Sequence, residues 1–77
     1  MAIPRKRALE RLESYLKRVD EHLTLMASEP EAPALAHWKY ETGLWLSVME
    51  EMLRHVGKKT SVEWRAIIEI RKAKLGQ

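Results

Sequence analysis

The chain has 77 residues, with 14 Lys or Arg, 11 Asp or Glu and no Cys. This length fits one domain and excludes a barrel, a doubly wound sheet or a two-domain enzyme. The formal charge of +3 is mildly basic, and the lack of cysteine excludes disulfides, thiolate zinc sites and cysteine nucleophiles. Small secreted domains usually need disulfides, so the composition predicts a cytoplasmic location.

Residues 4–27 show the pattern of a long amphipathic helix. Pro4 suits the first helical position. Apolar residues then recur at alternating spacings of three and four, which is a heptad stripe. The stripe consists of Leu9, Leu12, Leu16, Val19, Leu23 and Met26. We expect a helix of about 36 Å.

A second helix is predicted over residues 33–56. Pro30 and Pro33 separate it from the first helix, because proline cannot continue a helix interior. Gly57 is a suitable residue just past its end. Its apolar residues cover an arc of about 200°, too wide for a helix that rests on one neighbour. We therefore expect this helix to be the central element, with its main stripe at Leu35, Trp38, Thr42, Trp45, Met49, Met52 and Val56.

A third helix is predicted over residues 60–75. Thr60 and Glu63 have the spacing of a capping box, which marks a helix start. The apolar residues of this segment are densest in its first half, and Arg71, Lys72 and Lys74 interrupt the second half. We expect the first half to pack and the C-terminal end to be exposed or frayed.

Together these segments predict a single all-α domain over residues 1–77. Short loops place successive helices side by side, so we expect an up-down-up bundle with a long antiparallel hairpin and a shorter third helix. The third helix would leave part of the second uncovered. Small domains often complete their cores by self-association, and we therefore expect a homodimer or a higher homo-oligomer. No uninterrupted apolar run is longer than that of Leu44–Leu46, which predicts no membrane span.

Large apolar side chains on the second and third helices form the predicted contact surface for a partner. Trp is enriched at interface hot spots, although it also fills cores, and the sequence leaves both interpretations open. The predicted function is a non-enzymatic protein–protein interaction module that self-associates through this face and binds an unidentified protein partner. The predicted contacts are Trp38, Trp45, Leu46, Leu53, Trp64 and Ile68.

One flank of the second helix carries His37, Glu41, Glu51 and His55. If two copies crossed antiparallel near Val48, the first pair would approach the second pair of the other copy. A dimer-interface enzyme or metal protein using these four residues is therefore one alternative function. Residues four apart also form ordinary contacts on a helix surface, and the spacing differs from the Glu-x-x-His of di-iron bundles. We predict no metal and no cofactor, and we expect Glu41 to pair with another helix, for example through an arginine.

Basic residues near both ends of the chain suggest another alternative, a small nucleic-acid-binding or regulatory protein. Residues 58–77 contain six cations and two carboxylates. Against this reading, the third helix lacks a clean polar face, and no aromatic stacking platform is visible. The candidate phosphate contacts are Arg5, Lys6, Arg7, Lys58, Lys59, Arg65 and Lys72.

Sequence motifs of catalysis are absent. The chain has neither a glycine-rich phosphate loop nor a nucleophile elbow. Its serines, at positions 14, 28, 47 and 61, have no neighbouring His and Asp in an activating arrangement. We therefore predict no catalytic residues and favour a protein that is not an enzyme.

Overall fold

The computed structural model describes residues 3–76; Met1, Ala2 and Gln77 of the predicted domain lie outside the described residues. The elements are α1 (Arg5–Ser28), α2 (Leu35–Met52), a 3₁₀ turn η1 (Leu53–His55) and α3 (Lys58–Leu75). Residues 3–76 contain no strand, and the predicted all-α class is confirmed. Within that range, no helix is long and apolar enough to cross a membrane.

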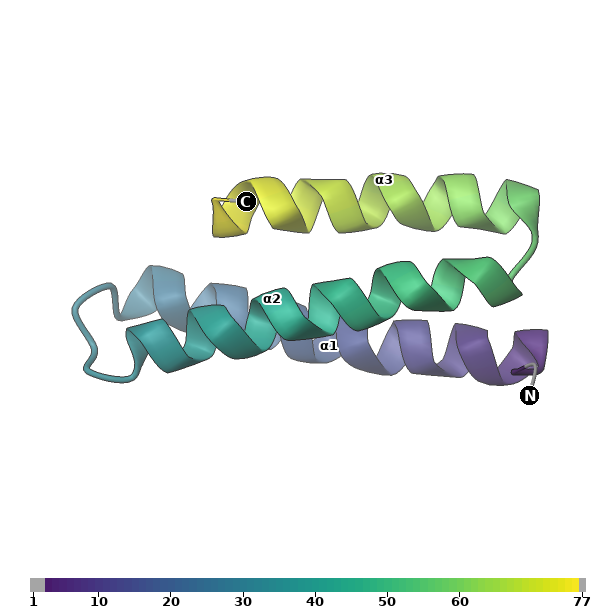
Figure 1. Cartoon of the computed structure of the whole chain (residues 1–77). Helices are drawn as coiled ribbons and strands as arrows, with labels where there is room; N and C mark the ends of the chain where they lie inside the picture. Colours follow the sequence, from purple (N-terminus) through teal and green to yellow (C-terminus); the bar gives the residue numbers. More distant parts are fainter. Residues whose placement is uncertain (1–2, 77) are drawn as a thin grey trace.

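The three helices lie alongside one another (Figure 1). α1 and α2 form a long hairpin, and α3 returns beside α2 in the opposite direction. α3 ends well before the hairpin loop, so the loop end of the hairpin extends beyond it. The described chain measures 40 × 22 × 16 Å along its principal axes.

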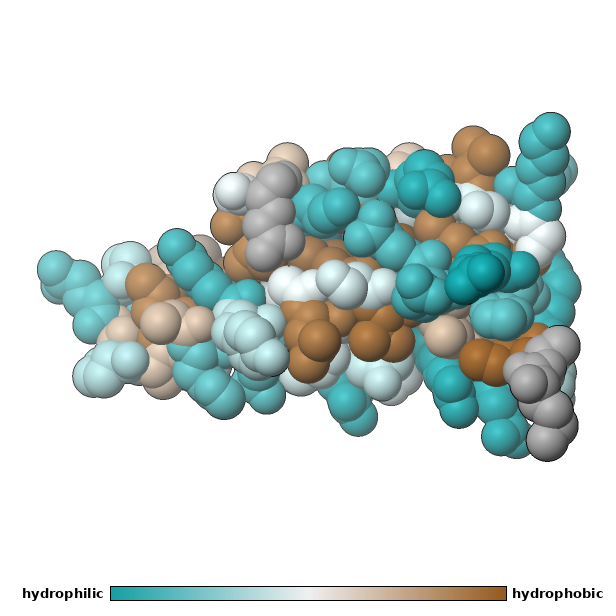
Figure 2. All heavy atoms as spheres, viewed as in Figure 1, coloured by the Kyte–Doolittle hydropathy of each residue, from teal (hydrophilic) through white to brown (hydrophobic). Residues whose placement is uncertain are grey.

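The core lies where the three helices meet, and α2 with η1 provides the largest share of it. In Figure 2, hydrophobic atoms follow the seam between α3 and the hairpin. Among the described residues, Thr42 is the one buried polar side chain. Its hydroxyl donates a hydrogen bond to the Trp38 carbonyl at 2.7 Å, so its hydrogen-bonding need is satisfied. The core residues are Ala8, Leu12, Val19, Leu46, Met49, Met52, Leu53, Val56 and Ile68.

The start of α3 differs from the prediction. The helix begins at Lys58 after Gly57, whose φ is +86°, and no side chain caps it. Glycine is the residue that adopts this backbone conformation most easily. The predicted capping box at Thr60 is wrong, because the Thr60 hydroxyl instead accepts a hydrogen bond from Arg5 Nη2 at 3.0 Å. Arg5 Nε also donates to the Val56 carbonyl at 3.1 Å, so one side chain joins the start of α1 to the α2–α3 turn.

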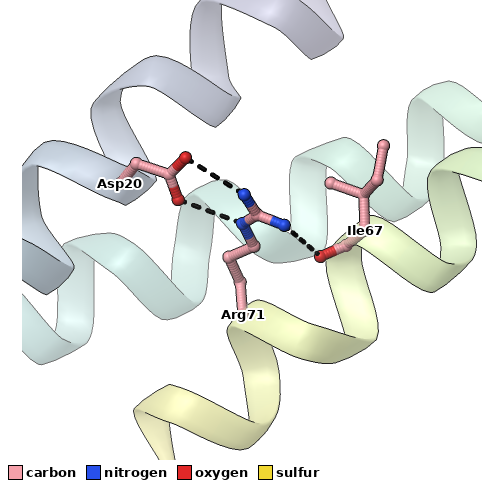
Figure 3. A network of polar contacts seen from close by, with 3 residues as sticks. All are labelled: Asp20, Ile67 and Arg71. Atoms are coloured by element: carbon pink, nitrogen blue, oxygen red, sulfur yellow. Dashed lines mark hydrogen bonds and ion pairs between the residues drawn. The ribbon is translucent and has the colours of Figure 1, made fainter.

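The second half of α3 is held by two charged contacts. Arg71 donates from Nε and Nη2 to the two carboxylate oxygens of Asp20 at 3.0 and 3.2 Å, and from Nη1 to the Ile67 carbonyl at 3.3 Å (Figure 3). Lys72 Nζ lies 3.3 Å from Glu50 Oε2. α3 continues to Leu75, so the C-terminal end is not frayed, although Ala73 and Lys74 are exposed as expected. Two of the three cations that interrupt the apolar pattern, Arg71 and Lys72, attach α3 to α1 and to α2.

We predict that Arg71→Lys lowers the free energy of unfolding by about 1 kcal/mol, because lysine cannot make the two parallel hydrogen bonds to Asp20. The effect stays small because solvent screens the pair, in which Asp20 is 46% exposed. Chemical denaturation measures it, and Arg65→Lys is the control, since Arg65 is an exposed arginine on the same helix. Equal stability of the two variants would show that the bidentate contact contributes nothing.

Candidate functional site

The hairpin carries a cluster of aromatic and charged side chains on the side away from α3. Glu50 and Asp20 mark the side that faces α3, because they pair with its cations. At 3.6 residues per turn, Glu41 lies about 180° from Glu50 around α2, and His22 lies about 160° from Asp20 around α1. The aromatic cluster consists of Tyr15, Arg18 and His22 of α1 and His37, Glu41 and Trp45 of α2.

Glu41 connects the two helices of the hairpin. Its Oε1 lies 3.4 Å from His22 Nε2 and 3.2 Å from His37 Nε2. A histidine can donate an Nε2 proton to a carboxylate in its neutral and its charged form. The predicted contact with another helix is present, but the partner is a histidine of α1 and not an arginine.

The aromatic rings of the cluster form a row in which one cation contacts two of the rings. His22 and Trp45 pack edge to face, with ring centroids 4.7 Å apart and an angle of 81° between the ring planes. The guanidinium carbon of Arg18 lies 5.5 Å from the Tyr15 centroid and 6.0 Å from the Trp45 centroid. Both distances are within the range of a cation–π interaction. Arg18 is exposed and the rings are half-buried, so the row is accessible from solvent.

Uncovered apolar side chains lie beside this row on α2. Leu44 is 50% exposed and Tyr40 is 70% exposed, and Val48, one turn after Leu44, is half-buried. Figure 2 shows hydrophobic surface over the middle of α2, on the side away from the seam with α3. The aromatic cluster, Leu44 and Val48 together form what we call the open face of the hairpin.

The six predicted partner contacts fall into two groups. Leu46, Leu53 and Ile68 are 1%, 5% and 0% exposed, so they belong to the chain's own core and offer no surface to a partner. Trp38, Trp45 and Trp64 are half-buried, and Trp45 lies on the open face.

The four residues of the predicted polar site do not assemble within one chain. His37 and Glu41 meet as described, whereas Glu51 Oε2 lies 3.4 Å from Arg54 Nη1. His55 belongs to η1, and among the described residues it makes no ion pair with Glu51. Residues 3–76 contain no group of three or more His, Asp or Glu side chains that could hold a metal ion.

Two of the seven candidate phosphate contacts already have partners. Arg5 binds Val56 and Thr60, and Lys72 pairs with Glu50. The other five are exposed and, among the described residues, have no carboxylate within ion-pair distance. They are Lys6, Arg7, Lys58, Lys59 and Arg65.

Arg18 and His22 are the site residues that the sequence analysis missed. The signal was present, since Tyr15, Arg18 and His22 form a row at spacings of three and four, one position before Leu16, Val19 and Leu23 of the heptad stripe. A row that flanks a core stripe lies at the edge of the buried surface. Such positions face the neighbouring helix obliquely, and cross-helix contacts occur there.

No protein-family model matches this sequence, and neither the curated proteins nor the solved structures contain a detectably similar protein. The geometry of the described residues is therefore the basis for the functional argument.

We predict that His22→Ala destabilises the chain by about 1 kcal/mol, because it removes the edge-to-face contact with Trp45 as well as a partner of Glu41. His22→Phe keeps a ring beside Trp45 and loses only the polar contact, so it should cost less. Denaturation of the two variants, with and without Trp45→Ala in each, measures the ring contribution as a coupling energy. A coupling energy near zero for His22 and Trp45 would contradict the structural role of the rings.

Proposed function

We propose that this protein is a non-enzymatic helical interaction module that self-associates through the open face of the hairpin. The observation that carries the proposal is the exposure of Leu44, at 50%, next to half-buried Trp45 with Arg18 against its ring. Trp, Tyr and Arg are the residue types most enriched at interface hot spots. The open face places all three beside uncovered aliphatic side chains.

The arrangement of apolar residues on α2 supports an additional neighbour. Residues such as Met49 and Leu46 are buried inside the chain, yet Leu44 and Val48 extend the apolar arc to the side away from α3. A helix needs apolar residues only where it meets a neighbour. A contiguous exposed apolar patch in a small protein marks an interaction surface.

A second copy of this chain is the partner that fits the pattern best. Glu41 and His55 lie seven residues on either side of Val48. In a two-fold antiparallel pair that crosses at Val48, each Glu41 would face His55 of the other copy. Such self-complementarity is what an isologous interface requires. About 800 Å² per partner makes a standard interface, a modest part of the 5397 Å² accessible surface.

This proposal refines the surface predicted from the sequence. The contact face moves from α2 and α3 to α1 and α2, because Leu46, Leu53 and Ile68 already hold α3 in place. Trp45 is the predicted contact residue that remains central.

The test is the oligomeric state of Leu44→Glu, measured by light scattering during size-exclusion chromatography over a range of concentrations. We expect the wild type to be a dimer and Leu44→Glu to be a monomer with an unchanged helix content, since a buried unpaired charge at the interface is strongly unfavourable. Ile70→Glu is the matched control, because Ile70 is 53% exposed but lies on α3. It should remain a dimer.

Two results would overturn the proposal. The first is a wild-type chain that stays monomeric up to high micromolar concentration. The second is a dimer that survives Leu44→Glu, or that Ile70→Glu dissociates instead, since either would place the interface elsewhere on the molecule.

A further inference from the structure

The end of the molecule where α1 and α3 begin is densely cationic. Residues 3–7 and 57–61 contain five Lys or Arg and no Asp or Glu. These segments are far apart in the sequence but meet in space, because Arg5 binds both Val56 and Thr60. Figure 1 shows the start of α1 and the α2–α3 turn at the same end.

Four of the five cations at this end are available to a ligand. Arg5 is occupied by its hydrogen bonds and acts as the residue that positions the two segments. The other four side chains are exposed, and within residues 3–76 none has a carboxylate within 4 Å. We call Lys6, Arg7, Lys58 and Lys59 the cationic end.

This concentration of positive charge destabilises the fold. The N-terminal end of a helix carries a partial positive charge and favours Asp or Glu in its first turn. α1 and α3 have no acidic residue there and no side-chain cap. α1 begins instead with Arg5, Lys6 and Arg7, and α3 begins with Lys58 and Lys59. The two helix starts are adjacent. Residues that destabilise a fold and make no compensating contact are expected at functional sites.

We propose that the cationic end binds the phosphate backbone of a nucleic acid. Several cations on two adjacent segments match a polyanion with regularly spaced phosphates better than a single small anion. The first N–H groups of a helix have no intrahelical acceptor, so the two helix starts add further donors for phosphate oxygens. Contacts of this kind go to the backbone and carry no direct sequence readout, so the binding is sequence-independent.

The apolar residues at this end favour nucleic acid over an anionic membrane. Peripheral membrane helices insert a broad apolar face beside their cations. Here Ile3 packs against the core and Val56 is 1% exposed. Val62, one turn into α3, is exposed but by itself offers too little apolar surface for insertion. The described residues of this end therefore present charge with little apolar surface to bury in lipid.

The experiment measures binding of the full chain to a labelled duplex DNA of about 20 base pairs by fluorescence anisotropy, at several salt concentrations. Four phosphate contacts predict that the logarithm of the association constant falls with the logarithm of salt concentration with a slope of about −3 to −4. Vesicles of phosphatidylserine and phosphatidylcholine form the comparison arm, and we expect much weaker binding to them.

The decisive variant is Lys58→Glu combined with Lys59→Glu. We expect at least a ten-fold loss of DNA affinity, because about half of the contacts are removed. We also expect a higher Tm, since acidic residues in the first turn of α3 are favourable. Lys17→Glu combined with Lys74→Glu is the control, because it changes the net charge equally but lies outside the cationic end. It should keep most of the affinity and should not raise the Tm.

Three outcomes would overturn the proposal. They are the absence of DNA binding at low salt, binding to the vesicles that is stronger than binding to DNA, and an equal loss of affinity in both double variants. A fall in the Tm of the Lys58→Glu and Lys59→Glu variant would also contradict it, since the charge at this end would then stabilise the fold. None of these outcomes depends on the open face of the hairpin.

Discussion

The structure depends on the breadth of the apolar surface of α2. One helix can cover only a stripe of its neighbour, and α1 covers the stripe that includes Met49 and Thr42. Leu46 and Leu53 lie further around α2 and become buried only because α3 packs there. Leu44 and Val48 lie on the other edge, where Leu44 is 50% exposed and Val48 is only half-buried. The third helix and the open face are therefore two consequences of the same pattern.

Charged contacts help to orient α3 on the hairpin. Its inner face contributes one fully buried residue, Ile68, and Trp64 and Leu75 pack beside it against the core. Arg71 reaches Asp20 on α1, and the next residue, Lys72, reaches Glu50 on α2. These two contacts lie on opposite flanks of Ile68 and support the orientation that the apolar contacts favour. In this orientation Val62 and Ile70 face solvent, so hydrophobicity alone does not identify the α3 residues that are buried.

The fold class and the three helices were predictable because they follow from local signals. The heptad stripe, the two prolines and Gly57 each act over a few residues. The start of α3 was not predictable in this way, because the hydroxyl of Thr60 is taken by Arg5, 55 residues away. The partner of Arg71 is Asp20, which is 51 positions away in the sequence, so this contact was also not predictable from local signals.

The candidate site shows the same division between local and long-range information. Periodicity placed Glu41 at the edge of the apolar arc of α2, and this edge does meet another helix. It could not identify His22 as the partner, since that requires the register of α1 against α2. Nor could it separate Leu46 from Trp45, which are adjacent in sequence. One faces the side that α3 covers, and the other faces the side that remains open.

The two proposed surfaces differ in the physics that would govern binding. At the open face, affinity would come from removing Trp45 and Leu44 from water, which depends little on salt. At the cationic end, it would come from the release of counterions and would fall steeply with salt. An antiparallel pair crossing at Val48 would point the two cationic ends in opposite directions along the 40 Å axis of each chain. Self-association through the open face would therefore leave both cationic ends accessible, and the two activities could operate in one assembly.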